Sequence, residues 1–138
     1  MIELSNVSKT YKAGNKALRN VNIKIEDGEF VVIVGRSGSG KSTLIKLLLK
    51  ETEPTYGKIT VNDFILTRMP RRYVPKYRRR LGVVFQDFRL LKNKTVFESV
   101  AFAQRVIGVS PRKIKSSVPE ILQMVGLSSK YKFYPHQL

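Results

Sequence analysis

The sequence has no cysteine, no tryptophan and a single histidine, His136. Without cysteine the chain has neither disulfide bonds nor thiolate ligands for a metal or redox centre. One histidine cannot form a histidine cluster around a metal ion. Long apolar runs are missing as well, because the longest covers only residues 30–34, far less than a membrane span needs. The start at Met1 shows no signal-peptide pattern, so a soluble cytosolic protein is expected.

Acidic residues are scarce, and the chain is strongly basic as a result. The 138 residues carry 26 Lys and Arg against 10 Asp and Glu, a net charge of +16. Residues 1–67 have a net charge of +3, whereas residues 68–138 have +13. Such a surplus indicates an anionic partner, and composition leaves nucleic acid, a phosphate-rich ligand and an acidic membrane surface all open. Length and the 42% hydrophobic content suit one globular domain.

The first half of the chain has the pattern of strands followed by a helix. Residues 2–7 and 21–25 alternate like half-buried strands, with a polar loop over residues 8–15 between them. Residues 30–34 are continuously apolar and mostly β-branched, which predicts a parallel strand buried on both faces. The leucine-rich residues 44–49 predict an apolar helix.

A complete P-loop lies between the predicted strand at 30–34 and that helix, with the pattern Gly-x-x-x-x-Gly-Lys-Ser. Glycines let the backbone curl so that successive N–H groups face phosphate oxygens, and the helix start adds its positive dipole end. The lysine supplies a cation for the β- and γ-phosphates, and the serine hydroxyl can join the Mg²⁺ shell. The candidate nucleotide-binding residues are Gly35, Ser37, Gly38, Ser39, Gly40, Lys41, Ser42 and Thr43.

Two further strands and a basic helix are predicted between residues 58 and 85. Residues 58–61 form one candidate strand, and residues 82–85 a second strand of the buried type. Between them, residues 68–80 are rich in arginine, and Tyr73 and Tyr77 recur at helical spacing. This spacing predicts a short amphipathic helix despite Pro75.

The last third of the chain is predicted to be helical. Residues 95–107 form one helix, and Ser110 followed by Pro111 begins another. Pro119 is expected to kink or split this second helix, and Gly126 to end it. Its apolar face comprises Ile114, Val118, Ile121, Leu122 and Val125.

With the P-loop, Tyr11 and Gln86 in these positions, the chain resembles the first part of an ABC-type ATPase. The resemblance implies an α/β P-loop NTPase domain, with a P-loop core and antiparallel strand region over about residues 1–86. The Q-loop and a truncated helical subdomain would follow over residues 87–138. It implies that Tyr11 stacks on adenine and that Gln86, as the Q-loop glutamine, touches Mg²⁺ or the attacking water. The implied cofactors are ATP and Mg²⁺, with Ser42 and Gln86 as the metal-contacting residues.

The run Phe85-Gln86-Asp87-Phe88-Arg89-Leu90-Leu91 resembles a narrower branch of that family, the ATP-binding subunits of bacterial cell-division complexes. This branch implies a transmembrane partner subunit and a homodimer with a second ATPase subunit. It also implies a position on the cytoplasmic face of the cell membrane and a role in controlling septal peptidoglycan cleavage.

The end of the sequence bears on hydrolysis, because Leu138 matches the first residue of the family signature Leu-Ser-Gly-Gly. The Walker B aspartate, the catalytic glutamate and the switch histidine would follow that signature. The sequence is therefore expected to be a fragment of a longer ATPase that binds nucleotide without hydrolysing it.

Two other functions fit parts of the same pattern. The ATP-binding subunit of an exporter of the lipoprotein or macrolide type shares most of these motifs. A basic nucleic-acid-binding module fits the +13 half and the tyrosines among the arginines at 71–80, which could stack on bases. The pattern matches no recognised nucleic-acid-binding fold, so no specific nucleic acid is expected as a partner.

Overall fold

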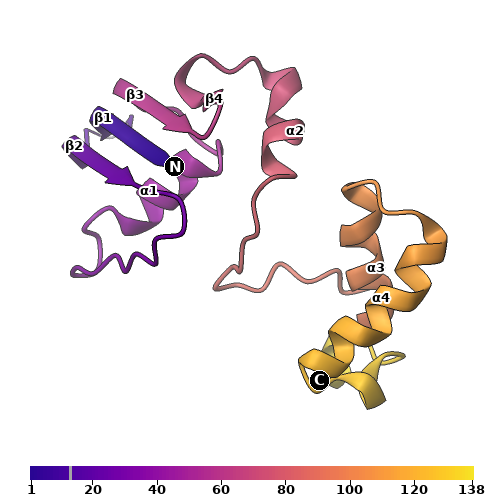
Figure 1. Cartoon of the computed structure of the whole chain (residues 1–138). Coiled ribbons are helices and arrows are strands. Elements are labelled where there is room, and N and C mark those ends of the chain that lie inside the picture. Colours follow the sequence, from indigo (N-terminus) through magenta and orange to yellow (C-terminus); the bar gives the residue numbers. More distant parts are fainter. Residues whose placement is uncertain (13) are drawn as a thin grey trace. The chain divides into compact units, whose positions relative to one another are not determined.

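A computed structural model of the chain describes residues 1–12 and 14–138, which divide into two units, Met1–Arg80 and Leu81–Leu138 (Figure 1). Residue 13, part of the predicted polar loop, lies outside the described residues. The first unit contains β1 (Ile2–Thr10), β2 (Lys16–Ile25), α1 (Lys41–Leu48), β3 (Tyr56–Val61), β4 (Phe64–Ile65), the 3-10 turns η1 (Leu66–Arg68) and η2 (Arg71–Tyr73), and α2 (Val74–Arg78). The second contains α3 (Val96–Val106), α4 (Pro111–Met124) and the 3-10 turns η3 (Ser128–Lys130) and η4 (Pro135–Gln137).

The sheet of the first unit has the strand order β2-β1-β3-β4, and all of its neighbouring strands are antiparallel. Leu4 in the central strand β1 pairs with Ile23 on one side and Ile59 on the other. The strands predicted at 2–7, 21–25 and 58–61 are confirmed, and each extends beyond its predicted range. Apolar side chains from the sheet, α1 and the residue after it, η1 and α2 form the core of this unit: Leu4, Val7, Leu18, Leu44, Leu47, Leu49, Ile59, Val61, Leu66 and Tyr77.

A bulge in β1 shows why the sheet needs a glycine in β3. Asn6 has a φ of 53°, and its backbone N–H donates to Asn22 Oδ1 at 2.8 Å instead of joining the strand ladder. Gly57 has a φ of 93°, and a Cβ there would lie 2.4 Å from the Asn6 carbonyl oxygen. No other residue allows this close approach of the two strands.

The helix α1 is held at its carboxyl end by residues of α2. The Tyr77 hydroxyl donates to the Leu48 carbonyl, and Arg78 Nε donates to the Leu49 carbonyl at 2.9 Å. Tyr77 is 1% exposed, and its ring lies 5.4 Å from that of Phe64. The amphipathic helix predicted over 68–80 is thus confirmed in a shorter form, with Pro75 in its first turn, where proline is tolerated.

Two predicted buried strands are wrong for this structure. Residues 30–34 and 82–85 belong to no strand, and Phe30 and Val84 are 93% and 96% exposed. A parallel strand forms only where neighbouring strands supply its hydrogen bonds and other elements cover both faces. The described residues provide neither for these two segments.

In the second unit, α3 and α4 pack around a small apolar core and have well-formed ends. Thr95 and Glu98 form a reciprocal capping box at the start of α3, and Ser110 caps α4. The hydrogen bonds from both Thr95 groups keep the pKa of the Glu98 carboxyl below its usual value. Both helix predictions are confirmed, and the core comprises Val96, Ala101, Ile114, Val118 and Leu122.

Two details predicted for α4 differ from the structure. The helix is continuous through Pro119 and is not split there, and the kink expected from an interior proline stays a prediction. Ile121 and Val125, predicted on the buried face, are exposed, since only one side of α4 packs against α3. Gly126, with a φ of 70°, ends the helix as predicted.

Burial raises the pKa of the Tyr77 hydroxyl to about 12, from its usual value of 10. The neutral phenol therefore stabilises the fold below pH 10, and this contribution is lost as the pH rises towards 12. We expect Tyr77→Phe to cost about 1 kcal/mol at pH 8 through the lost hydrogen bond, and this deficit to shrink between pH 10 and 12. Urea unfolding of the parent chain and of Tyr77→Phe between pH 8 and pH 12 measures the difference in their free energies of unfolding. Groups that both proteins share titrate alike and cancel in this difference. A deficit that stays constant with pH would contradict the buried hydrogen-bonding role.

Candidate functional site

The P-loop leads directly into α1, and the start of this helix is open. Gly40, the residue before the helix, has a φ of 96°, and no described side chain caps the first turn. The Leu44 N–H bonds back to the Gly40 carbonyl at 2.9 Å, so the N–H groups of Lys41, Ser42 and Thr43 precede the first intrahelical donor. These groups and the helix dipole make a ready binding site for an anion.

Gly40 occupies a position that admits no side chain. A Cβ there would lie 2.4 Å from the Ala17 carbonyl oxygen and 2.8 Å from Leu18 Cδ2, both in β2. The loop is therefore pressed against the antiparallel sheet at this point. Gly38 also has a positive φ, 77°, but a Cβ there would meet open space.

The Lys41 ammonium lies inside the curl of the loop. Its Nζ donates to the Gly35 carbonyl at 2.6 Å, to the Arg36 carbonyl at 2.8 Å and to Ser39 Oγ at 3.4 Å. The cation is thereby held among the loop's own oxygens at the mouth of the open helix end. This placement suits a group that meets the outer phosphates of a nucleotide.

Tyr11 and Thr43, 32 residues apart in the chain, come into contact at this site. The Tyr11 hydroxyl lies 3.2 Å from Thr43 Oγ1, while the tyrosine side chain stays partly exposed. Thr43 is buried in the first turn of α1. The structure therefore brings the predicted adenine-stacking residue to the edge of the phosphate loop.

The surroundings of Tyr11 include residues that the sequence analysis missed. Lys9 Nζ lies 5.2 Å from the centre of the Tyr11 ring and donates to the Glu53 carbonyl at 2.6 Å. The Thr10 N–H donates to Thr55 Oγ1 at 2.9 Å. These contacts join the end of β1 to the segment before β3, and no sequence motif links partners so far apart.

The two predicted metal-contacting residues belong to different units. Ser42 is exposed in the first turn of α1, beside Lys41. Gln86 is exposed in a turn of the second unit, so its role as Q-loop glutamine stays a prediction. Within the described parts of the chain, no three His, Asp or Glu side chains gather as a metal site. A Mg²⁺ ion here would take a hydroxyl from Ser42 and its other oxygens from phosphate and water.

These features define a P-loop domain, and the chain belongs to the ABC transporter family. The model of that family, described as ABC transporter, matches residues 18–138. Among solved structures, the ATP-binding cassette MJ0796 in a dimeric post-hydrolysis state bound to ADP and Pi has a TM-score of 0.90 and 35% identity. This comparison covers 100% of the present chain and 63% of the solved one. The predicted α/β P-loop fold is confirmed.

Named relatives make the likeness more specific. The cell division ATP-binding protein FtsE of Bacillus subtilis is 49% identical over 138 residues, and FtsE of Mycobacterium tuberculosis is 49% identical over 139. The methionine import ATP-binding protein MetN of Helicobacter pylori is 42% identical over 138 residues. Each alignment covers the whole of this chain, 60% of the FtsE proteins and 42% of MetN. The chain thus spans about 60% of the length of the FtsE proteins it matches.

The described residues contain no helix that is both long and apolar enough to cross a membrane.

Replacing Gly40 by alanine is expected to disrupt the site more than replacing Gly38. Both substitutions impose a left-handed backbone on alanine, which costs about 1–2 kcal/mol. Only Gly40→Ala adds the clash with the Ala17 carbonyl, so it should be clearly the more destabilising. Urea unfolding followed by circular dichroism compares the two variants. Equal losses would show that the loop does not press against β2.

Proposed function

We propose that the chain is the nucleotide-binding part of an ABC-type ATPase subunit that acts in bacterial cell division. The observation that carries this proposal is a built P-loop in a chain 49% identical to FtsE over its whole length. The transmembrane partner would be of the FtsX type, and ATP use would control the cleavage of septal peptidoglycan. The subunit would sit on the cytoplasmic face of the membrane.

The residues of the site fit Mg·ATP. The open turn of α1 offers N–H groups to phosphate oxygens, and the curled loop places the Lys41 ammonium beside them. Ser42 would supply a hydroxyl to Mg²⁺, and the aromatic ring of Tyr11 would stack on the adenine base. ATP with Mg²⁺ supplies the phosphoanhydride bond on which this family acts.

Hydrolysis of ATP needs more than the phosphate-binding groups of the P-loop and the first turn of α1. Phosphoryl transfer to water requires a positioned water and stabilisation of the charge that develops on the phosphoryl group. Asp87, Glu98 and Glu120 are the carboxylates of residues 68–138, and Glu98 already serves the cap of α3. We therefore propose that a second ATPase subunit and sequence beyond these 138 residues complete the catalytic centre. The 138-residue chain would bind nucleotide without turning it over.

A transport role is the second candidate, because MetN importers match the chain at 42% identity. The ATP-binding subunit of a lipoprotein or macrolide exporter, the alternative that the motifs also fit, is a form of this transport role. The neighbouring gene distinguishes these functions: a gene for an FtsX-type membrane protein supports the division role, and one for a permease supports transport. The burial of Tyr77 counts against the nucleic-acid alternative, since this ring cannot stack on bases.

Lys41→Ala should weaken binding of Mg·ATP about tenfold or more, because one charge-assisted hydrogen bond contributes roughly 1.5–3 kcal/mol. Lys46→Ala is the matched control, since Lys46 is an exposed lysine in the last turn of the same helix. Titration calorimetry on both variants and the parent chain gives the affinities. Phosphate release in the same samples should stay at background. Equal affinities for all three proteins would contradict the assignment of the P-loop.

Tyr11 should contribute to binding of the base and not to binding of the phosphates. Tyr11→Ala is expected to weaken ATP about fivefold or more, since base–aromatic stacking contributes roughly 1–3 kcal/mol. Tyr11→Phe keeps the ring and should retain most of the affinity. Inorganic tripolyphosphate should bind all three proteins alike. If tripolyphosphate binding fell as much as ATP binding, Tyr11 would be acting through Thr43 and the loop.

A further inference from the structure

A surface of exposed basic side chains surrounds α2, outside the P-loop site. We call it the basic surface and define it by six exposed residues that do not bond to the end of α1, which are Arg68, Arg71, Arg72, Lys76, Arg79 and Arg80. No acidic residue occurs between positions 64 and 86. None of the six side chains has an ion-pair partner among the described residues. The positive charge of this surface is therefore not neutralised within the unit.

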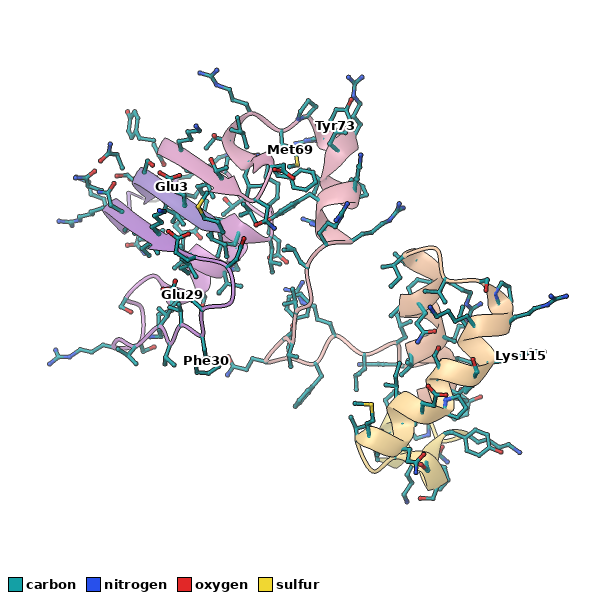
Figure 2. All side chains as sticks on the ribbon, in the orientation of Figure 1. Glu3, Glu29, Phe30, Met69, Tyr73 and Lys115 are labelled. Carbon is teal, nitrogen blue, oxygen red and sulfur yellow. The ribbon has the colours of Figure 1, made fainter. Side chains whose placement is uncertain are left out.

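Two residues of the segment, Tyr77 and Arg78, fix this surface in place; Tyr77 is buried, and Arg78 is exposed but bonds to the end of α1. Tyr77 is buried against Phe64 and donates to the Leu48 carbonyl. Arg78 donates to the carbonyls of Leu49 and Lys50, at 2.9 and 3.2 Å. These bonds hold the segment against the end of α1, and its other basic side chains are exposed. Figure 2 shows nitrogen-tipped side chains projecting from the ribbon around Tyr73.

The chemistry of the surface suits phosphate groups at a membrane interface. Five of its six residues are arginine, whose planar guanidinium binds phosphate oxygens in a bidentate manner. Tyr73 lies among them, is 45% exposed and has the Arg72 guanidinium 5.0 Å from its ring centre. Tyrosine is enriched where a membrane meets water.

We propose that the basic surface binds the phosphate head groups of an anionic phospholipid bilayer. The choice of lipid over nucleic acid rests on the proposed function, which places the subunit at a membrane. It also rests on Tyr77, because a stacking platform that used both tyrosines of the segment would need this ring exposed, and it is 1% exposed.

The test is co-sedimentation of the chain with vesicles of phosphatidylglycerol and phosphatidylcholine, compared with vesicles of phosphatidylcholine alone. The parent chain should bind only the anionic vesicles, and binding should weaken as salt is added. The triple variant Arg71→Gln, Arg72→Gln, Arg79→Gln should lose about a hundredfold in affinity, because each basic side chain near the surface contributes about fivefold.

A matched control removes the same charge from another exposed position. The variant Arg112→Gln, Lys113→Gln, Lys115→Gln in α4 should bind anionic vesicles like the parent chain. Circular dichroism checks that each variant is folded. If the triple variant is not folded, the double variant Arg71→Gln, Arg72→Gln should still lose more than tenfold in affinity for anionic vesicles.

Several outcomes would overturn the proposal. One is equal binding to vesicles with and without anionic lipid. Another is a loss of vesicle affinity in the α4 control that equals the loss in the triple variant. A third is tighter binding of mixed-sequence DNA than of vesicles, lost in the triple variant, which would assign the surface to nucleic acid. Failure of the ATP site is separable, since Lys41→Ala should lose ATP affinity and keep vesicle binding.

Discussion

The two ends of α1 differ in how their backbone groups are hydrogen-bonded: the carboxyl end is fully bonded, and the amino end is open. The rest of the first unit depends on that difference. At the carboxyl end, every main-chain carbonyl of the last turn has a donor. Backbone N–H groups of Leu49, Glu51 and Lys50 bond to Ile45, Lys46 and Leu47, and side chains of Tyr77 and Arg78 bond to Leu48, Leu49 and Lys50. At the amino end no described side chain caps the helix. A helix fixed at one end can keep its other end open for an anion.

This arrangement links two features that are separate in the sequence. The arginine-rich segment does more than carry charge, because Tyr77 and Arg78 within it close the P-loop helix. The antiparallel sheet likewise sets the position of the phosphate loop, since β2 leaves no room for a side chain at Gly40 and the end of β1 brings Tyr11 to Thr43. The basic surface and the nucleotide site are therefore built on opposite ends of one short helix.

Local chemistry made much of this structure predictable. The strands β1, β2 and β3, the helix α1 after the P-loop and the helices α3 and α4 follow from periodicity, glycine placement and capping residues, all of which act within a few residues. Residues 30–34 were mispredicted because a buried strand depends on neighbours that the sequence pattern does not reveal. Two hydrogen bonds could not be predicted, because each joins residues about thirty positions apart: Tyr11 with Thr43, and Tyr77 with the Leu48 carbonyl. Only the tertiary structure reveals them.

The central claim is that the open end of α1 binds phosphate. An amide-resolved NMR titration of the ¹⁵N-labelled chain with inorganic tripolyphosphate tests it most directly, because the probe lacks a base and reports on each N–H separately. Saturable shifts of the N–H groups of residues 36–43 are predicted, whether or not the amides of residues 68–80 also shift through phosphate binding at the basic surface. Shifts confined to residues 68–80, or no saturable shift in the loop, would contradict the claim.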